Sequence, residues 1–106
     1  PGTLGRFQHG FDVRPDIVAV DNKKGPKDYL DRFYVDTLVH DPNALTMLLN
    51  TFGEKQMALG SDYPFPLGEH HPGQLIEDLN FDKGVMERLL SGTALEWLGL
   101  NKEQFL

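Results

Sequence analysis

Hydrophobic residues recur at helical spacing in the middle of the chain. Between positions 42 and 52 they follow the i, i+3, i+4, i+7 spacing that lines one face of a helix, at Leu45, Leu48, Leu49 and Phe52. Asp41 is a favourable N-cap residue and Pro42 suits the first helical position. Gly53 suits the position just past a helix end. The pattern therefore predicts a helix over residues 42–52.

Two apolar runs flank this helix and have the composition of β-strands. Residues 33–39, FYVDTLV, are rich in β-branched and aromatic side chains, and residues 56–62, QMALGSD, hold a shorter run. Nearly continuous apolar content is typical of parallel strands that are covered on both faces. Asp36 lies inside the first run, so we expect its buried carboxylate to have a hydrogen-bond partner.

The remaining segments are shorter. Glycines and prolines punctuate residues 1–25, which we interpret as an irregular segment that carries two arginines. Pro26 begins a short predicted helix, and further helices are expected near residues 72–79, after Asp82, and in the last part of the chain. That last helix would begin at Gly92-Thr93-Ala94, with Thr93 as its cap, and end at Gly99.

Strands that alternate with helices indicate parallel βα units and an α/β fold. Two strands cannot form a well-covered parallel sheet, so both need neighbours that this sequence does not contain. We therefore expect residues 1–106 to be the C-terminal piece of a single larger domain. Within it, residues 1–25 would be irregular, and residues 26–106 would hold the βα units and terminal helices.

Composition and charge exclude several classes of function. The net charge is −6, from 16 acidic and 10 basic residues, and the basic residues are scattered rather than gathered on one face. We therefore expect no nucleic-acid partner. The chain has no cysteine, which excludes disulfides and thiolate metal sites and fits a reducing, cytoplasmic location. No apolar stretch approaches the roughly 20 residues that a membrane span needs, and we expect no signal peptide.

Asp62 is the first candidate for chemistry because it ends the second apolar run. The C-terminal ends of parallel strands are where βα proteins build their sites. A carboxylate there can be a metal ligand, a general base or a helix cap, and an aspartate before a turn often only accepts backbone N–H groups. Pro64 and Pro66 restrict the loop that follows.

Arg6 and Arg14 are the second candidates, in the stretch GRFQHGFDVRPD. Two arginines in a glycine-containing segment can bind carboxylates in a bidentate manner. The alternative is a solvated arginine, or a local ion pair with Asp12 or Asp16. His9 lies between the arginines, and a lone histidine of this kind is more often exposed or structural than catalytic.

The other histidines are weaker candidates. His40 precedes Asp41-Pro42 near the end of the first strand, where it could reach a site but more often belongs to a capping region. His70 and His71 are adjacent, so their side chains point apart and make a poor metal pair. One carboxylate is also too few for catalytic zinc, which usually has about three protein ligands and a bound water.

Several stretches resemble the C-terminal part of the aminocarboxymuconate-semialdehyde decarboxylase family, in the amidohydrolase superfamily. They are, in order, GRFQHGFDVRPD, FYVDTLVHDP, GSDYPFPLGE and GTALEWLGL. The resemblance covers nearly all of the sequence. It implies a (β/α)8 TIM barrel, of which this chain would supply the last two strands and the terminal helices. Such barrels need about 250 residues, so this chain would hold well under half of one. By the resemblance, the family's HxH motif on the first strand and its histidines on the fifth and sixth strands would lie upstream of this sequence.

The resemblance also implies roles for individual residues. Asp62 matches an aspartate that binds Zn²⁺ and its water. Arg6 matches an arginine that reaches into the neighbouring subunit's site in a homodimer and binds a substrate carboxylate. Arg14 matches a second arginine of the same segment. The implied reaction is the zinc-dependent, non-oxidative decarboxylation of 2-amino-3-carboxymuconate 6-semialdehyde, a dicarboxylate, in tryptophan degradation by the kynurenine route.

Two other hypotheses remain open at the level of the sequence. The chain could be a non-catalytic fragment or interaction module, because it lacks most zinc ligands and should be inactive by itself. It could also come from a sister hydrolase or an aromatic-acid decarboxylase of the same superfamily. An HxH motif ahead of this sequence would favour an enzyme over the module.

Overall fold

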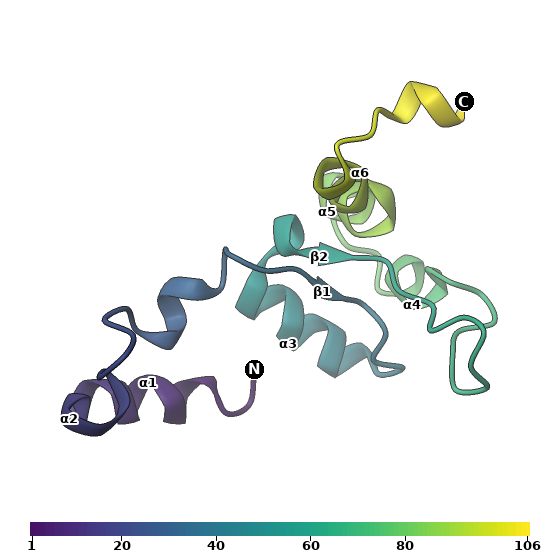
Figure 1. Ribbon diagram of the computed structural model, residues 1–106. Coiled ribbons are helices and arrows are strands. Elements are labelled where there is room, and N and C mark those ends of the chain that lie inside the picture. The colour runs from purple at the N-terminus through teal and green to yellow at the C-terminus, as the bar shows by residue number, and fades with distance from the viewer. The chain divides into compact units, whose positions relative to one another are not determined.

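The computed structural model describes all residues from 1 to 106. The chain divides into two compact units, Pro1–Phe33 and Tyr34–Leu106 (Figure 1). No helix combines the length and the apolar character that crossing a membrane requires.

The first unit is helical, which corrects the prediction of an irregular segment over residues 1–25. It contains α1 (Leu4–Val13), α2 (Pro15–Val18) and a 3₁₀ helix (Pro26–Tyr29). Gly5 and Gly10 lie inside α1 with open space where a Cβ would be. A glycine costs a helix about 1 kcal/mol relative to alanine, so it weakens a helix without ending it. Glycines alone were therefore a poor reason to predict a loop.

Gln8 connects α1 to the turn that begins the 3₁₀ helix. Its amide donates to Asp12 at 3.0 Å one helical turn away, and its Oε1 accepts from the Lys27 backbone N–H at 3.1 Å. A Cβ on Gly25 would lie 2.7 Å from Gln8 Nε2, so glycine allows this close approach. The Gly25 N–H donates in turn to Asp28 at 3.0 Å, which satisfies a free donor at the helix start.

The second unit contains two parallel strands, as the alternation of helices and strands predicted. β1 (Val35–Asp36) pairs with β2 (Met57–Ala58), in the register Val35↔Met57 and Asp36↔Ala58. Each strand has one neighbour and is much shorter than the apolar run that predicted it. Asp36 is exposed rather than buried, which corrects that expectation, and its carboxylate accepts the Leu38 N–H at 3.1 Å.

The helix α3 (Pro42–Phe52) forms where the apolar spacing predicted it. The Asp41 carboxylate accepts the Ala44 N–H at 2.8 Å, and Gly53 follows the helix with φ of 79°. Leu45 of this helix is fully buried in a core that it forms with Met57, Ile76 and Leu89. Figure 1 shows α3 on one side of the strands and α5 and α6 on the other.

The last helices follow one another closely. They are α4 (Gln74–Asp78), α5 (Lys83–Glu87), a π-helical turn (Arg88–Gly92), α6 (Thr93–Leu98) and a 3₁₀ helix (Lys102–Phe105). The π turn joins α5 to α6, so Thr93 lies inside a continuous helical segment. This corrects the prediction that Thr93 is the N-cap of the last helix. Its buried hydroxyl donates to the Glu54 carbonyl at 2.6 Å instead.

Candidate functional site

Asp62 and His40 occupy equivalent positions beyond the two strands. Asp36 and Ala58 are paired in register, and His40 and Asp62 follow them at the same spacing along the chain. Both have left-handed backbones, with φ of 52° for His40 and 56° for Asp62. Few residues other than glycine adopt this conformation, and such positions often mark functional sites. The two residues therefore occupy matching positions beyond the C-terminal end of the parallel sheet.

Backbone hydrogen bonds close the loop of residues 61–69, which we call the Asp62 loop. The Phe65 N–H donates to the Asp62 carbonyl at 2.8 Å, and the Gly68 N–H donates to the Phe65 carbonyl at 3.0 Å. The Glu69 N–H donates to the Ser61 carbonyl at 2.9 Å and joins the two ends. The loop thus has a defined backbone shape that depends on these bonds as well as on its prolines.

The Asp62 carboxylate is free within this loop. It is exposed and makes no hydrogen bond or ion pair in the structure. An aspartate with a purely local role would accept a backbone N–H of the turn, and Asp62 does not. The side chain is therefore open to an external ligand.

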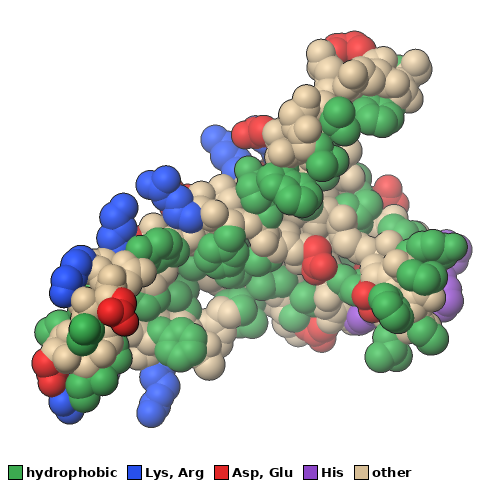
Figure 2. Space-filling model, viewed as in Figure 1, with side chains coloured by type: hydrophobic (Ala, Val, Ile, Leu, Met, Phe, Trp, Pro, Cys, Tyr) green, Lys and Arg blue, Asp and Glu red, His purple; other side chains and the backbone are tan.

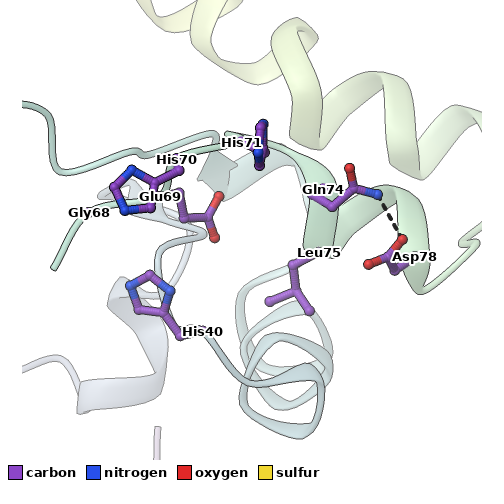
Figure 3. Close-up of a pocket in the computed structure, with 8 residues that line it drawn as sticks. All are labelled: His40, Gly68, Glu69, His70, His71, Gln74, Leu75 and Asp78. Atoms are coloured by element: carbon purple, nitrogen blue, oxygen red, sulfur yellow. Dashed lines mark hydrogen bonds between the residues drawn. The ribbon is translucent and has the colours of Figure 1, made fainter.

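A pocket of about 350 Å³ lies beside the Asp62 loop (Figure 3). His40 and His70 lie on one side of it, and Gln74 and Asp78 lie on the other, joined by a hydrogen bond of 2.8 Å. Its lining combines imidazole, carboxylate and amide groups, from His40, Gly68, Glu69, His70, His71, Gln74, Leu75 and Asp78. Asp62 does not line this pocket, so the free carboxylate and the hollow are separate features of the same end of the sheet.

His40 touches the Asp62 loop directly. Its Nε2–H donates to the Leu67 carbonyl at 2.8 Å. Sequence reasoning placed His40 in a capping region, but Asp41 is the residue whose side chain caps α3. The signal that could have found this contact is the spacing: His40 and Asp62 stand at matching distances from the ends of two adjacent parallel strands.

Arg6 lies on helix α1, and Arg14 lies at the junction of α1 and α2, rather than both in one irregular loop. Arg6 and His9 are both exposed on α1, and Arg6 makes no hydrogen bond or ion pair. Arg14 follows the helix and binds Asp16 through two bonds, of 2.9 and 2.8 Å, which is the local ion pair considered as an alternative. Both arginines belong to residues 1–33, whereas Asp62 belongs to the second unit.

The ion pair changes the titration of both partners. The hydrogen bond from Arg14 lowers the pKa of the Asp16 carboxyl, and the same bond raises the pKa of the Arg14 guanidinium. Both side chains are more than half exposed, so solvent screens the interaction. Arg14 is thus already occupied, whereas Arg6 remains available to bind an anion.

The chain alone does not assemble a metal site. No group of three or more histidine, aspartate or glutamate side chains lies close enough together to hold a metal ion. Zinc does accept carboxylate oxygen, and the free Asp62 carboxylate has the chemistry and exposure of one such ligand. Asp62 therefore fits zinc as one member of a site to which other ligands must be added.

Comparisons with known proteins indicate the family to which the chain is similar. The family model described as Amidohydrolase matches residues 7–100. A protein of Dictyostelium discoideum named 2-amino-3-carboxymuconate-6-semialdehyde decarboxylase is 53% identical over 107 residues, which is 100% of this chain and 30% of that protein. One of the same name from Caenorhabditis elegans is 41% identical over 103 residues, or 96% of this chain and 26% of that protein. The chain thus spans less than a third of these relatives' length.

Proposed function

Because this chain belongs to the amidohydrolase family, we propose that it supplies a zinc-binding aspartate, Asp62, to a longer decarboxylase that acts on 2-amino-3-carboxymuconate-6-semialdehyde. In this proposal the fold of the whole protein is a (β/α)8 barrel, with β1 and β2 as its seventh and eighth strands. The reaction belongs to tryptophan degradation by the kynurenine route. The names and identities of the two relatives support the substrate.

The position of Asp62 is the observation that carries this proposal. It lies beyond a parallel strand, has a left-handed backbone and presents an unpaired, exposed carboxylate. In barrels of this type the catalytic residues stand at the C-terminal ends of the strands. A carboxylate that only stabilised its own turn would accept a backbone N–H of that turn, and Asp62 accepts none.

Zinc is the proposed metal, and a carboxylate oxygen is one of the ligands that zinc accepts. When bound, it would lower the pKa of a coordinated water toward neutrality. Asp62 would hold the metal together with ligands from outside this chain. Arg6 would bind a substrate carboxylate, because its guanidinium is exposed and unpaired and presents a planar pair of donors. Arg14 is paired with Asp16 and would contact the substrate beside Arg6 only after that ion pair breaks.

A direct assay of the full-length protein tests the reaction. The purified protein should release CO₂ from 2-amino-3-carboxymuconate-6-semialdehyde, should lose this activity when a chelator removes zinc, and should regain it when zinc is restored. Cleavage of an amide or ester substrate in place of CO₂ release would favour a sister hydrolase. No turnover by the zinc-loaded protein would favour a non-catalytic module.

A mixing experiment tests whether Arg6 acts across a homodimer. In the proposed dimer each site combines Asp62 of one subunit with Arg6 of the other. Full-length Arg6→Ala and Asp62→Ala chains, each inactive as a homodimer, should therefore regain activity when subunits exchange, since one site in each mixed dimer holds both residues. Chains that exchange subunits without any recovery would show that Arg6 does not act in the partner's site.

A further inference from the structure

We propose that His40 is a positioning residue that holds the Asp62 loop in place through the Leu67 carbonyl. The bond from His40 Nε2–H to this carbonyl, at 2.8 Å, spans 27 positions of sequence and joins the loops that follow β1 and β2. The inference rests on the proposed function in one respect, because that function makes the placement of Asp62 important for zinc binding.

The loop has little other support from side chains. Its apolar side chains lie on the surface of this chain (Figure 2), with Tyr63 86% and Leu67 82% exposed, so packing within the chain does not fix the loop. His40 is the one side chain from outside residues 61–69 that hydrogen-bonds to it. Loss of the His40 contact should therefore free the far end of the loop.

The hydrogen bonds of the loop transmit this restraint to Asp62. Leu67 precedes Gly68, whose N–H donates to the Phe65 carbonyl at 3.0 Å, and the Phe65 N–H donates to the Asp62 carbonyl at 2.8 Å. Two backbone hydrogen bonds thus connect the segment at Leu67, which His40 holds, to Asp62, the proposed zinc ligand. A loop anchored in this way loses less conformational entropy when the metal binds.

The backbone of His40 gives the contact its geometry. With φ of 52°, it directs the chain from β1 toward Asp41 and the start of α3. Histidine and asparagine tolerate this conformation better than most residues. Histidine also carries a donor nitrogen far enough from the backbone to reach the Leu67 carbonyl. The shorter asparagine side chain has no donor at that distance.

Substitutions at this position separate the hydrogen bond from the backbone conformation. His40→Asn keeps a residue that accepts the left-handed backbone but shortens the side chain. His40→Gln places an amide nitrogen near the position of Nε2 and should restore part of the contact. His70→Asn is the matched control, because His70 lines the same pocket and its ring makes no hydrogen bond.

The test measures hydrogen exchange and zinc affinity in the full-length protein. In His40→Asn the amides of Phe65, Gly68 and Glu69 should exchange about three- to tenfold faster, the range that one hydrogen bond supports. Zinc affinity, measured by chelator competition, and kcat should fall by a similar factor with KM nearly unchanged. His40→Gln should recover part of each loss, and His70→Asn should match the wild type.

Two results would overturn the inference: wild-type exchange and zinc affinity in His40→Asn, or equal losses in the Asn and Gln variants. The exchange rates are read without any activity, so they judge the role of His40 even if the assigned reaction is wrong. An Asp62→Ala variant with unchanged zinc affinity would instead contradict the proposed function.

Discussion

Gly68 packs directly against the carbonyl oxygen of Ser61, so closely that a Cβ at this position would overlap it. The same Cβ would lie 3.1 Å from the carbonyl oxygens of Asp62 and Phe65. All three neighbours are backbone atoms of one loop, so none can move aside without opening it. Glycine is therefore required here by space.

Substitution of Gly68 by alanine should open the Asp62 loop. Overpacking of this kind typically costs about 1–3 kcal/mol, and here the strain falls on the loop backbone. We expect faster hydrogen exchange at Glu69 and a loss of zinc affinity in the full-length protein. Gly84→Ala is the matched control, since a Cβ there meets nothing within 4 Å. Equal behaviour of the two variants would contradict the assigned role of Gly68.

Asp41→Ala should destabilise the protein more than Asp82→Ala. Both aspartates precede a helix, but only Asp41 accepts a backbone N–H with its side chain, from Ala44 at 2.8 Å. Loss of such a cap costs about 0.5–2 kcal/mol. Urea unfolding of the two full-length variants checks the difference, and an equal loss of stability in both would show that the Asp41 cap contributes little.

Thr93→Val should cost about 1–3 kcal/mol of stability, because it leaves the Glu54 carbonyl without its buried donor. Thr93→Ser retains the hydroxyl and loses only a methyl group, so it isolates the hydrogen bond from packing. The serine variant should unfold closer to the wild type. If serine proves the more damaging substitution, packing of the methyl group dominates at this site.

Arg14 should govern the titration of Asp16. The ion pair lowers the pKa of Asp16 in the folded protein, so its stabilisation is present above the unfolded value, about 3.9. That stabilisation is lost as the pH falls through the lower folded pKa. An NMR titration of the Asp16 carboxyl should show its pKa rise toward the ordinary value in Arg14→Gln. Arg6→Gln removes an unpaired arginine of α1 and should leave the Asp16 pKa unchanged. An Asp16 pKa insensitive to Arg14 would contradict the pairing.

Local signals in the sequence predicted the second unit well. Asp41, Pro42 and Gly53 bound α3 as expected, and the two apolar runs became parallel strands in the expected order. Each of these features is encoded by neighbouring residues. The resemblance to the amidohydrolase family is also confirmed, because the family match and both relatives cover most or all of the chain.

The failures have a physical cause in common. Asp36 was expected to be buried because an apolar run surrounds it, but burial depends on neighbours that a sequence pattern does not supply. Thr93 was expected to cap the last helix because threonine is a favourable N-cap residue, but the π-helical turn continues the helix through that point. In both cases structure beyond the few residues of the local pattern decided the outcome.

The candidate site was only partly readable from the sequence. Asp62 was identified because it ends a predicted parallel strand. Its left-handed backbone and unpaired carboxylate are visible only in the structure. The contact between His40 and Leu67 joins residues far apart in the chain, so no local motif encodes it. The spacing that makes His40 and Asp62 equivalent becomes informative once the strand register is known.

Zinc content measured beside turnover, in full-length Asp62→Ala, tests the central claim most directly. Loss of residues that merely support a metal ligand typically costs 10–100-fold in affinity or activity, so loss of a ligand should cost at least about a hundredfold. The account predicts a folded protein with that decline in both zinc affinity and decarboxylation, while Asp82→Ala, which removes an exposed aspartate outside the loop, stays near the wild type. A folded Asp62→Ala enzyme that retains its zinc and turns over at the normal rate would contradict it.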